Sequence, residues 1–147
     1  MSSEILKYSI DILMVEDNAT DVRLTEEALN NAKVLNSLYV VGDGEAALDF
    51  LYQRGRYATV ERPDLVLLDL NLPKIDGREV LKIMKSDETL KSIPVVILTA
   101  SNSETDMVRA YNLGANCYIT KPVDFQRFVE IVRTINDFWL TAVVVPT

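Results

Sequence analysis

Four short apolar runs in the sequence are each followed at once by side chains that can do chemistry. Glu16 and Asp17 follow the first of these runs, and Asp69 follows the second. Thr99 and Lys121 follow the other two. Three carboxylates, a hydroxyl and an ammonium group therefore stand at equivalent places in the chain.

These residue types suit phosphoryl transfer assisted by a divalent cation. Carboxylates that lie close together raise each other's pKa unless a cation lies among them, and no basic residue adjoins Asp17 or Asp69 in the sequence. A hard, oxygen-liganded ion is the natural solution, and Mg²⁺ is the expected cofactor. Asp69 would be the nucleophile. Mg²⁺ and Lys121 would each hold a phosphoryl oxygen, and the Thr99 hydroxyl or a backbone N–H would hold the third.

Each of these residues also has an ordinary structural interpretation when it is taken alone. An acidic pair after a strand usually serves a loop or a helix cap, and Thr99 could cap a helix. A lysine such as Lys121 is usually solvated, and Asp69-Leu70-Asn71 reads as a common turn. Their joint occurrence after four apolar runs favours the functional interpretation.

The elements that must position these residues alternate between strand and helix. Apolar runs predict strands over 10–15, 38–41, 65–68, 95–98 and 117–120, and helical spacing predicts helices over 20–32, 45–53, 76–85, 103–113 and 124–138. Gly114 stands where a helix often ends in glycine. The alternation predicts an α/β fold, a flavodoxin-like doubly wound parallel sheet with strand order 2-1-3-4-5. Ligands of such sheets bind at the carboxyl ends of the strands, where the candidate residues stand.

Composition and charge exclude several classes of protein. The chain has 147 residues, of which 48% are hydrophobic and 25% charged, as in one globular domain over 1–147 with a core over about 10–138. No apolar run reaches the ~20 residues of a membrane span, and the first residues do not resemble a signal peptide. The net charge of −7 argues against a nucleic-acid partner. The single cysteine, Cys117, suits a reducing cytoplasm, and we expect it to be buried in a strand.

The sequence contains no histidine. This absence excludes a histidine-ligated zinc ion and a Ser-His-Asp triad. It also excludes a phosphohistidine formed on this chain. A phosphoryl group that reaches Asp69 would therefore come from another molecule.

The motifs around these residues resemble the receiver domains of two-component response regulators, which are CheY-like proteins. The residues that carry the resemblance are Val15-Glu16-Asp17-Asn18, Leu67-Leu68-Asp69-Leu70-Asn71-Leu72-Pro73-Lys74-Ile75-Asp76-Gly77, Leu98-Thr99-Ala100 and Lys121-Pro122. The resemblance implies that Asp69 is the phosphoacceptor and that Glu16 and Asp17 form the acidic metal pocket. It also implies that Asn71 is a metal ligand through its backbone carbonyl. Such a protein accepts phosphate but is not a turnover enzyme.

The same resemblance implies a switch. Thr99 would sense the phosphoryl group, Lys121 would pair with it, and Tyr118 would be the aromatic residue that rotates inward. This movement would alter the surface formed by the fourth helix, the fifth strand and the fifth helix, through which the protein would signal to other proteins. The peptide bond between Lys121 and Pro122 is expected to be cis. Leu72 stands where many members of the family have methionine.

A narrower resemblance points to a partner. The segments 49–57, 62–64 and 138–140 resemble the response regulators paired with cyanobacterial phytochromes, which are light-sensing histidine kinases. A phytochrome histidine kinase is therefore the expected partner.

The sequence also predicts a homodimer. Ile131 and Phe138 lie at the edge of the apolar arc of the last helix, and Trp139 and Leu140 open an apolar tail over 139–147. Exposed apolar surface of this kind usually marks an interface. The resemblance to the phytochrome-linked regulators also implies dimers. In the alternative, the tail folds back over its own domain.

Two other functions are compatible with parts of the pattern. A haloacid-dehalogenase-like phosphohydrolase also uses an aspartate at a strand end as its nucleophile. Enzymes of that class have the motif Asp-x-Asp there, whereas in this chain the second position of the motif is Asn71. Those enzymes usually add a cap domain, for which the sequence leaves no room. A receiver fold used only as an unphosphorylated scaffold would have no need of the acidic cluster, which costs stability without a cation.

Overall fold

The computed structural model describes the backbone of residues 9–144 and the side chains of residues 9–137. Its strands are β1 (Ile10–Val15), β2 (Asn36–Val41), β3 (Leu65–Leu68), β4 (Val95–Thr99) and β5 (Cys117–Thr120). Its helices are α1 (Ala19–Asn31), α2 (Gly44–Leu51), α3 (Gly77–Ser86), α4 (Glu104–Leu113) and α5 (Phe125–Val144), with a short 3₁₀ helix, η2 (Gly55–Tyr57).

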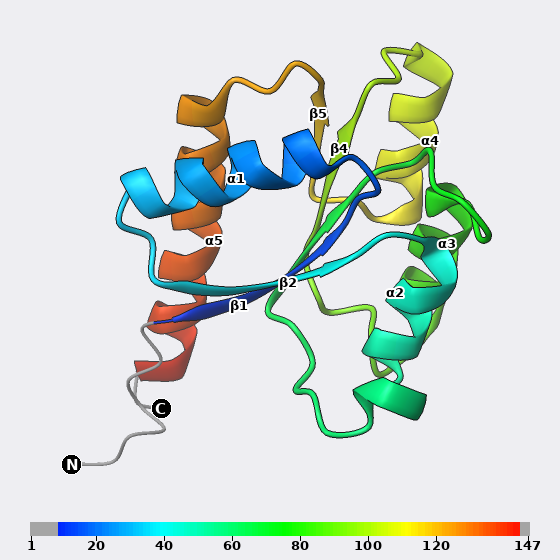
Figure 1. Ribbon diagram of the computed structural model, residues 1–147, viewed down its shortest axis with the longest axis horizontal. Helices are drawn as coiled ribbons and strands as arrows, with labels where there is room; N and C mark the ends of the chain where they lie inside the picture. The colour runs from blue at the N-terminus through cyan, green and yellow to red at the C-terminus, as the bar shows by residue number, and fades with distance from the viewer. Residues whose placement is uncertain (1–8, 145–147) are drawn as a thin grey trace.

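The strands form one parallel sheet between two layers of helices. The strand order is β2-β1-β3-β4-β5, which confirms the predicted flavodoxin-like topology. Helices α1 and α5 cover one face of the sheet, and α2, α3 and α4 cover the other (Figure 1). All neighbouring strands are parallel, so the carboxyl ends of β1, β3, β4 and β5 lie at one edge.

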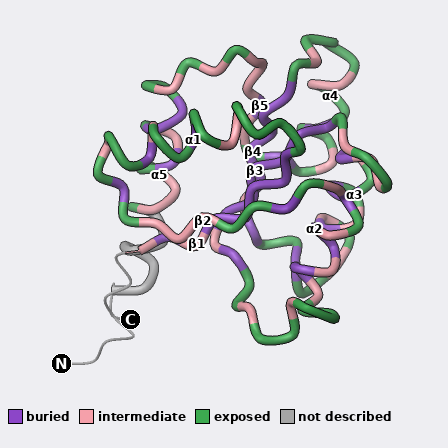
Figure 2. The backbone as a smooth tube through the Cα atoms, in the orientation of Figure 1, coloured by how far each residue is buried: buried purple, intermediate pink, exposed green. Residues whose placement is uncertain are grey.

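The two helical layers explain why the central strands are apolar on both faces. Every residue of β3 and β4 is buried, as Figure 2 shows by the colour along the middle of the sheet. Side chains that alternate along a strand enter different cores. Val66 and Leu68 pack in the core under α2, α3 and α4, whereas Leu65 and Leu67 pack in the core under α1 and α5.

Short polar side chains begin the helices that follow the strands. Asn18, Asp43, Asp76 and Ser103 each accept a hydrogen bond from a backbone N–H in the first turn of the next helix. Gly114 ends α4 with a φ of 110°, a left-handed conformation that favours glycine. These caps fix the points at which the chain turns away from the carboxyl edge of the sheet.

Apart from shifts of one or two residues at the ends of elements such as β2 and α2, two expectations about the fold need correction. The last helix was expected to end at 138, but α5 continues to Val144, because residues 139–144 contain neither glycine nor proline and the next proline is Pro146. Cys117 was expected to be buried but is partly exposed, because β5 is an edge strand and leaves one side of Cys117 uncovered.

Candidate functional site

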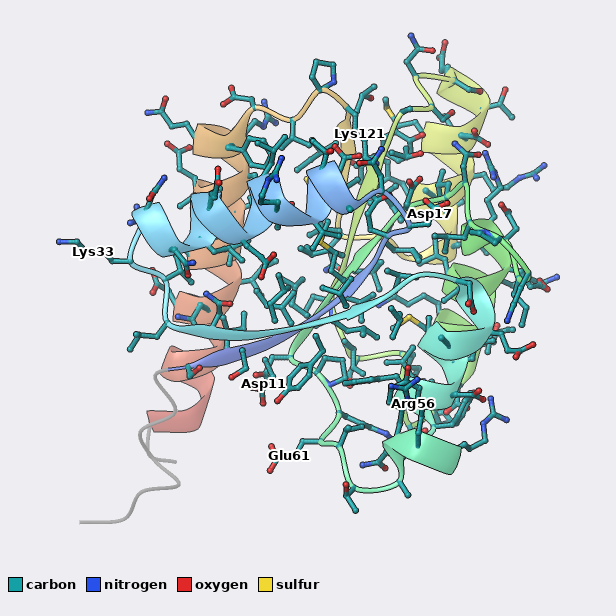
Figure 3. The ribbon with its side chains drawn as sticks, in the orientation of Figure 1. Asp11, Asp17, Lys33, Arg56, Glu61 and Lys121 are labelled. Atoms are coloured by element: carbon teal, nitrogen blue, oxygen red, sulfur yellow. The ribbon has the colours of Figure 1, made fainter. Side chains whose placement is uncertain are left out.

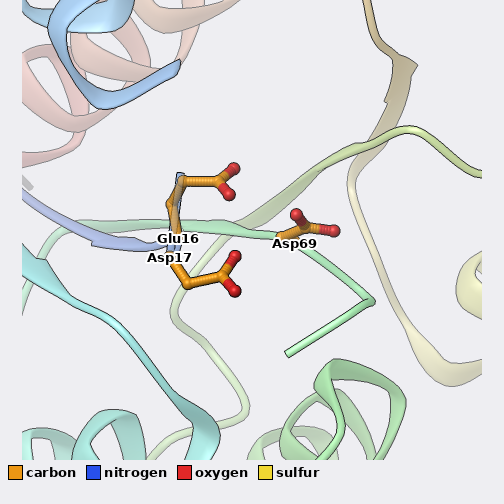
Figure 4. Close-up of side chains that lie close together, drawn as sticks. All are labelled: Glu16, Asp17 and Asp69. Carbon is orange, nitrogen blue, oxygen red and sulfur yellow. The ribbon is translucent and has the colours of Figure 1, made fainter. Parts of the chain in front are cut away.

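The predicted carboxylates meet at the carboxyl edge of the sheet. Glu16 and Asp17 follow β1 and Asp69 follows β3, and these two strands pair with Val15 opposite Leu68. One carboxylate oxygen from each of the three acidic residues lies within 4.8 Å of the others (Figure 4). The register of the sheet therefore brings together residues that are far apart in the sequence.

The site places negative charge where water has little access. Glu16 is 3% exposed and Asp69 is 6% exposed, whereas Asp17 is exposed at the rim. Burial raises the pKa of Glu16 above its ordinary value, the hydrogen bond from Lys121 acts against this, and the charge of Asp69 raises the pKa further. Such a site favours a bound cation.

The Lys121 ammonium group is the counter-charge of the site. It lies 2.7 Å from Glu16 Oε1 and 3.2 Å from Asp69 Oδ2. A third carboxylate, Asp21 on α1, lies 2.8 Å away. Burial by itself lowers the pKa of Lys121, but the hydrogen bonds with Asp21 and Glu16 outweigh this effect and keep the pKa above its ordinary value. Lys121 and Asp17 lie at the same edge of the sheet (Figure 3).

The backbone fixes the direction of the Asp69 carboxylate. The N–H of Asp69 donates to Val15 O at 3.1 Å, and the N–H of Asn71 donates to Asp69 Oδ1 at 3.0 Å. Asp69 Oδ2 faces the Lys121 ammonium group. The carboxylate is therefore held by one backbone bond and one charged partner, in the manner of a positioned nucleophile.

Thr99 and Lys121 are neighbours through the pairing of β4 with β5. Thr99 lies opposite Thr120, and the N–H of Lys121 donates to Thr99 O at 2.8 Å. The Thr99 side chain is fully buried, and its Oγ1 accepts the N–H of Ser101 at 3.4 Å. Thr99 ends the strand next to the one that Asp69 follows, as predicted. The peptide bond between Lys121 and Pro122 is cis, also as predicted.

Tyr118 is buried beneath the loop that follows β4. Its Oη donates to Ser101 O at 2.9 Å, and its N–H donates to Tyr111 Oη at 3.0 Å. Only 9% of Tyr118 is exposed. The ring is therefore already turned inward in this structure, which is the position that the expected switch would reach by rotation, and its hydroxyl contacts the loop that begins at Thr99.

An ion-pair network beside the site was not predicted from the sequence. The Arg78 guanidinium donates to both Asp106 oxygens, at 3.0 and 2.7 Å, and to Asp76 Oδ1 at 3.0 Å. The Ser101 hydroxyl donates to Asp106 Oδ2 at 2.7 Å. The hydrogen bonds from Arg78 and then from Ser101 lower the pKa of Asp106 to about 2. The network joins the starts of α3 and α4 to the loop that contacts Tyr118.

The contact of Asp21 with Lys121 was also not predicted from the sequence. Asp21 stands three residues after the helix cap Asn18, where a capping-box carboxylate is common, so its presence in the first turn of α1 has an ordinary explanation. The sequence alone does not reveal that its carboxylate faces Lys121. That contact depends on the pairing of strands distant in the sequence.

The site has the donor set of a hard divalent cation. Glu16, Asp17 and Asp69 supply carboxylate oxygens, which are the ligands that Mg²⁺ and Mn²⁺ prefer over nitrogen or sulfur. The raised pKa of Glu16 indicates that the cluster gains from added positive charge. The backbone carbonyl of Asn71 remains a predicted ligand. The residues present therefore fit such an ion.

The predicted dimer residues are described only in part. Ile131 on α5 lines a groove of about 500 Å³ together with Cys117 of β5. The side chains of Phe138, Trp139 and Leu140 lie outside the described residues. Within the described part of the chain, no helix is long and apolar enough to span a membrane.

Comparison with known proteins agrees with the fold and the site. Residues 12–133 match the response regulator receiver domain family. The chain belongs to this family and is a receiver-type response regulator. The resemblance predicted from the pocket motifs is confirmed.

Among its relatives are response regulators of phytochromes. The chain is 47% identical to response regulator Rcp1 of Synechocystis sp. over 92% of both chains. It is 50% identical to the phosphorylated cyanobacterial phytochrome response regulator RcpA, with a TM-score of 0.78 over 95% of this chain and 99% of that one. It is 46% identical to the Mn²⁺-bound form of Rcp1, with a TM-score of 0.78 over 94% and 99% of the two chains.

Proposed function

We propose that the protein accepts a phosphoryl group on Asp69 from a histidine kinase, with Mg²⁺ bound by Glu16, Asp17, Asp69 and the carbonyl of Asn71. The observation that carries the proposal is the position of Asp69 Oδ2, 3.2 Å from the Lys121 ammonium group and within the acidic cluster. A structure of a phosphorylated relative and one of a Mn²⁺-bound relative support it.

In the transfer step a carboxylate oxygen of Asp69 forms a bond to phosphorus. The bond between phosphorus and the imidazole nitrogen of the donor breaks, and its electron pair leaves with that nitrogen. The bound cation supplies charge neutralisation on the phosphoryl oxygens. Lys121 pairs with a second oxygen, and the Thr99 hydroxyl donates to a third.

We propose that the phosphoryl group acts on the rest of the molecule through Thr99. Movement of Thr99 toward the phosphoryl group displaces the loop that starts at Thr99, and Tyr118 reports the change because its hydroxyl is bonded to Ser101 O. The surface of α4, β5 and α5 is then the signalling surface, biased by one covalent ligand.

The partner in this proposal is a phytochrome histidine kinase of the cytoplasm, and the regulator acts as a homodimer. Similarity to Rcp1 and RcpA supports the kinase class. Phosphotransfer profiling against the histidine kinases of the source organism tests it. Fastest transfer from a kinase other than a phytochrome would contradict this partner.

The phosphorylation step is tested with acetyl phosphate and Mg²⁺. Mass spectrometry should detect one phosphoryl group that is stable in acid and labile in base. Asp69→Asn should abolish the modification, while Asp87→Asn, at the far end of α3, should leave it unchanged. Unaltered labelling of Asp69→Asn would remove the assignment. Steady turnover of p-nitrophenyl phosphate would favour a phosphohydrolase instead.

A further inference from the structure

The Lys121 ammonium group contacts three carboxylates, of which two belong to the candidate metal cluster and one does not. Glu16 and Asp69 belong to the candidate metal cluster, whereas Asp21 does not. A cation bound by the cluster would pair with the charges of Glu16 and Asp69 and so weaken their attraction to Lys121. Asp21 would then remain as the partner of Lys121 outside the metal ligands.

The local structure of α1 directs Asp21 toward Lys121. In a capping box, the third residue of the helix accepts the N–H of the cap residue. Here the N–H of Asn18 donates to Glu16 Oε2 at 3.2 Å instead. The Asn18 side chain still accepts the N–H of Asp21 at 3.0 Å, which fixes the first turn of the helix. The Asp21 carboxylate accepts from Lys121 at 2.8 Å.

Asp21 also differs from its neighbours in exposure. Its side chain is 31% exposed, whereas the side chains of Glu16 and Asp69 are 2% and 8% exposed. Asp21 therefore lies at the mouth of the site. A phosphoryl group entering from solvent meets Lys121 while that lysine is already paired with a carboxylate at the rim.

We propose that Asp21 is a positioning residue that competes with the phosphoryl group for Lys121 and thereby sets the affinity of the site for phosphoryl. The inference rests on the proposed function. In the unphosphorylated protein, Asp21 holds the ammonium group beside Asp69. After transfer, Lys121 must exchange this carboxylate for a phosphoryl oxygen, and the exchange weakens the net gain from the new ion pair.

The test measures the affinity of the full chain for beryllofluoride, a phosphoryl mimic, at saturating Mg²⁺. Asp21→Asn removes the competing charge, so beryllofluoride should bind about fivefold to tenfold more tightly, the size expected of one partly exposed charge pair. Asp21→Glu keeps the charge and should bind as the wild type does. Asp124→Asn is the matched control. It removes the same charge at the start of another helix, α5, where Asp124 accepts backbone N–H groups.

A second readout separates this role from a structural one. Mg²⁺ alone should bind to Asp21→Asn no more tightly than to the wild type, because a freed Lys121 pairs more closely with Glu16 and Asp69. A helix-stabilising role would move both affinities in the same direction. Beryllofluoride affinity that is unchanged or weaker in Asp21→Asn overturns the inference, as does an equal gain in Asp124→Asn. A wild-type protein that binds no beryllofluoride overturns the proposed function itself.

Discussion

Gly77 begins α3 against the backbone that carries the phosphoacceptor. A Cβ at this position would lie 2.1 Å from Asp69 O and 2.7 Å from Leu70 Cα. Both are backbone atoms, which cannot move aside as a flexible side chain can. The glycine therefore permits the tight turn between Asp69 and α3, which the N–H of Gly77 closes on Leu70 O at 3.0 Å.

This close approach predicts the cost of one methyl group. Gly77→Ala should lower the free energy of unfolding by about 2 kcal/mol or more, because the backbone around Asp69 must shift. Gly42→Ala is the control, because a Cβ there meets nothing within 4 Å, and it should change stability by less than about 0.5 kcal/mol. Urea unfolding measures both. Equal effects of the two substitutions would show that the contact with Asp69 carries no cost.

At the scale of the elements, the Arg78–Asp106 ion pair joins α3 to α4. The pKa of Asp106 is about 2, against an ordinary value of 3.8, so the carboxylate binds a proton less readily in the folded protein than in the unfolded one. Its contribution to stability is present above pH 3.8 and is lost as the pH falls toward 2. The loop that contacts Tyr118 depends on the same carboxylate through Ser101.

Substitution of Arg78 should therefore change the acid titration of Asp106. In Arg78→Gln the pKa of Asp106 should rise toward its ordinary value, because the largest cause of the lowering is removed. Carboxyl NMR titration measures this directly. The stability difference between wild type and variant should be largest above pH 4 and should shrink toward pH 2. An unchanged Asp106 titration would mean that the hydrogen bond from Ser101 and the charge of Arg109 are enough to lower its pKa.

The link from the site to the α4–β5–α5 surface runs through Tyr118. Beryllofluoride with Mg²⁺ should shift the NMR resonances of Tyr118 and of residues along α4, because the loop bonded to its hydroxyl starts at Thr99. In Thr99→Ala the shifts at Tyr118 should be much reduced, although the pocket still binds the mimic. If the resonances of Tyr118 do not change when the mimic binds, Tyr118 has only a packing role and does not take part in the switch.

Elements with a strong local signal were predicted well. The bounds of β3 and β5 agree with the structure, because each is a short apolar run between polar residues. The parallel order then placed Glu16, Asp17 and Asp69 together, since adjacent strands end at one edge. Helix starts were correct to within a residue or so where a capping side chain was present, as at Ser103.

What the sequence did not reveal depends on contacts between distant segments. Asp21 and Lys121 are separated by 100 residues, and Arg78 and Asp106 by 28. Each of these side chains has an ordinary local explanation, such as a first-turn acid or an exposed helical arginine. Only the assembled sheet decides which of them face one another.

At the scale of the whole molecule, charge and surface limit the partners. The net charge of −7 disfavours binding to nucleic acid, so we expect the protein to signal through contacts with other proteins. The groove between β5 and α5 combines Ile131 and Ile135 with the polar side chains of Arg127 and Glu130. An apolar centre with charged neighbours is a common composition for a protein interface.

We expect a homodimer in which this groove takes part. Ile131 is partly exposed on α5, and the backbone of the helix continues from it to Val144, which lengthens the element that a second copy would contact. Light scattering at micromolar concentration should give the mass of a dimer. Ile131→Glu should shift the equilibrium toward monomer, because it places a charge at the apolar centre of the interface, where the charge would be desolvated. Gln126→Glu is the control, since it adds the same charge to an exposed position of α5 roughly 140° around the helix.

Both variants should still accept phosphate on Asp69 from acetyl phosphate, since neither position touches the phosphorylation pocket. A monomer mass for the wild type would favour the alternative, in which the end of the chain covers its own domain.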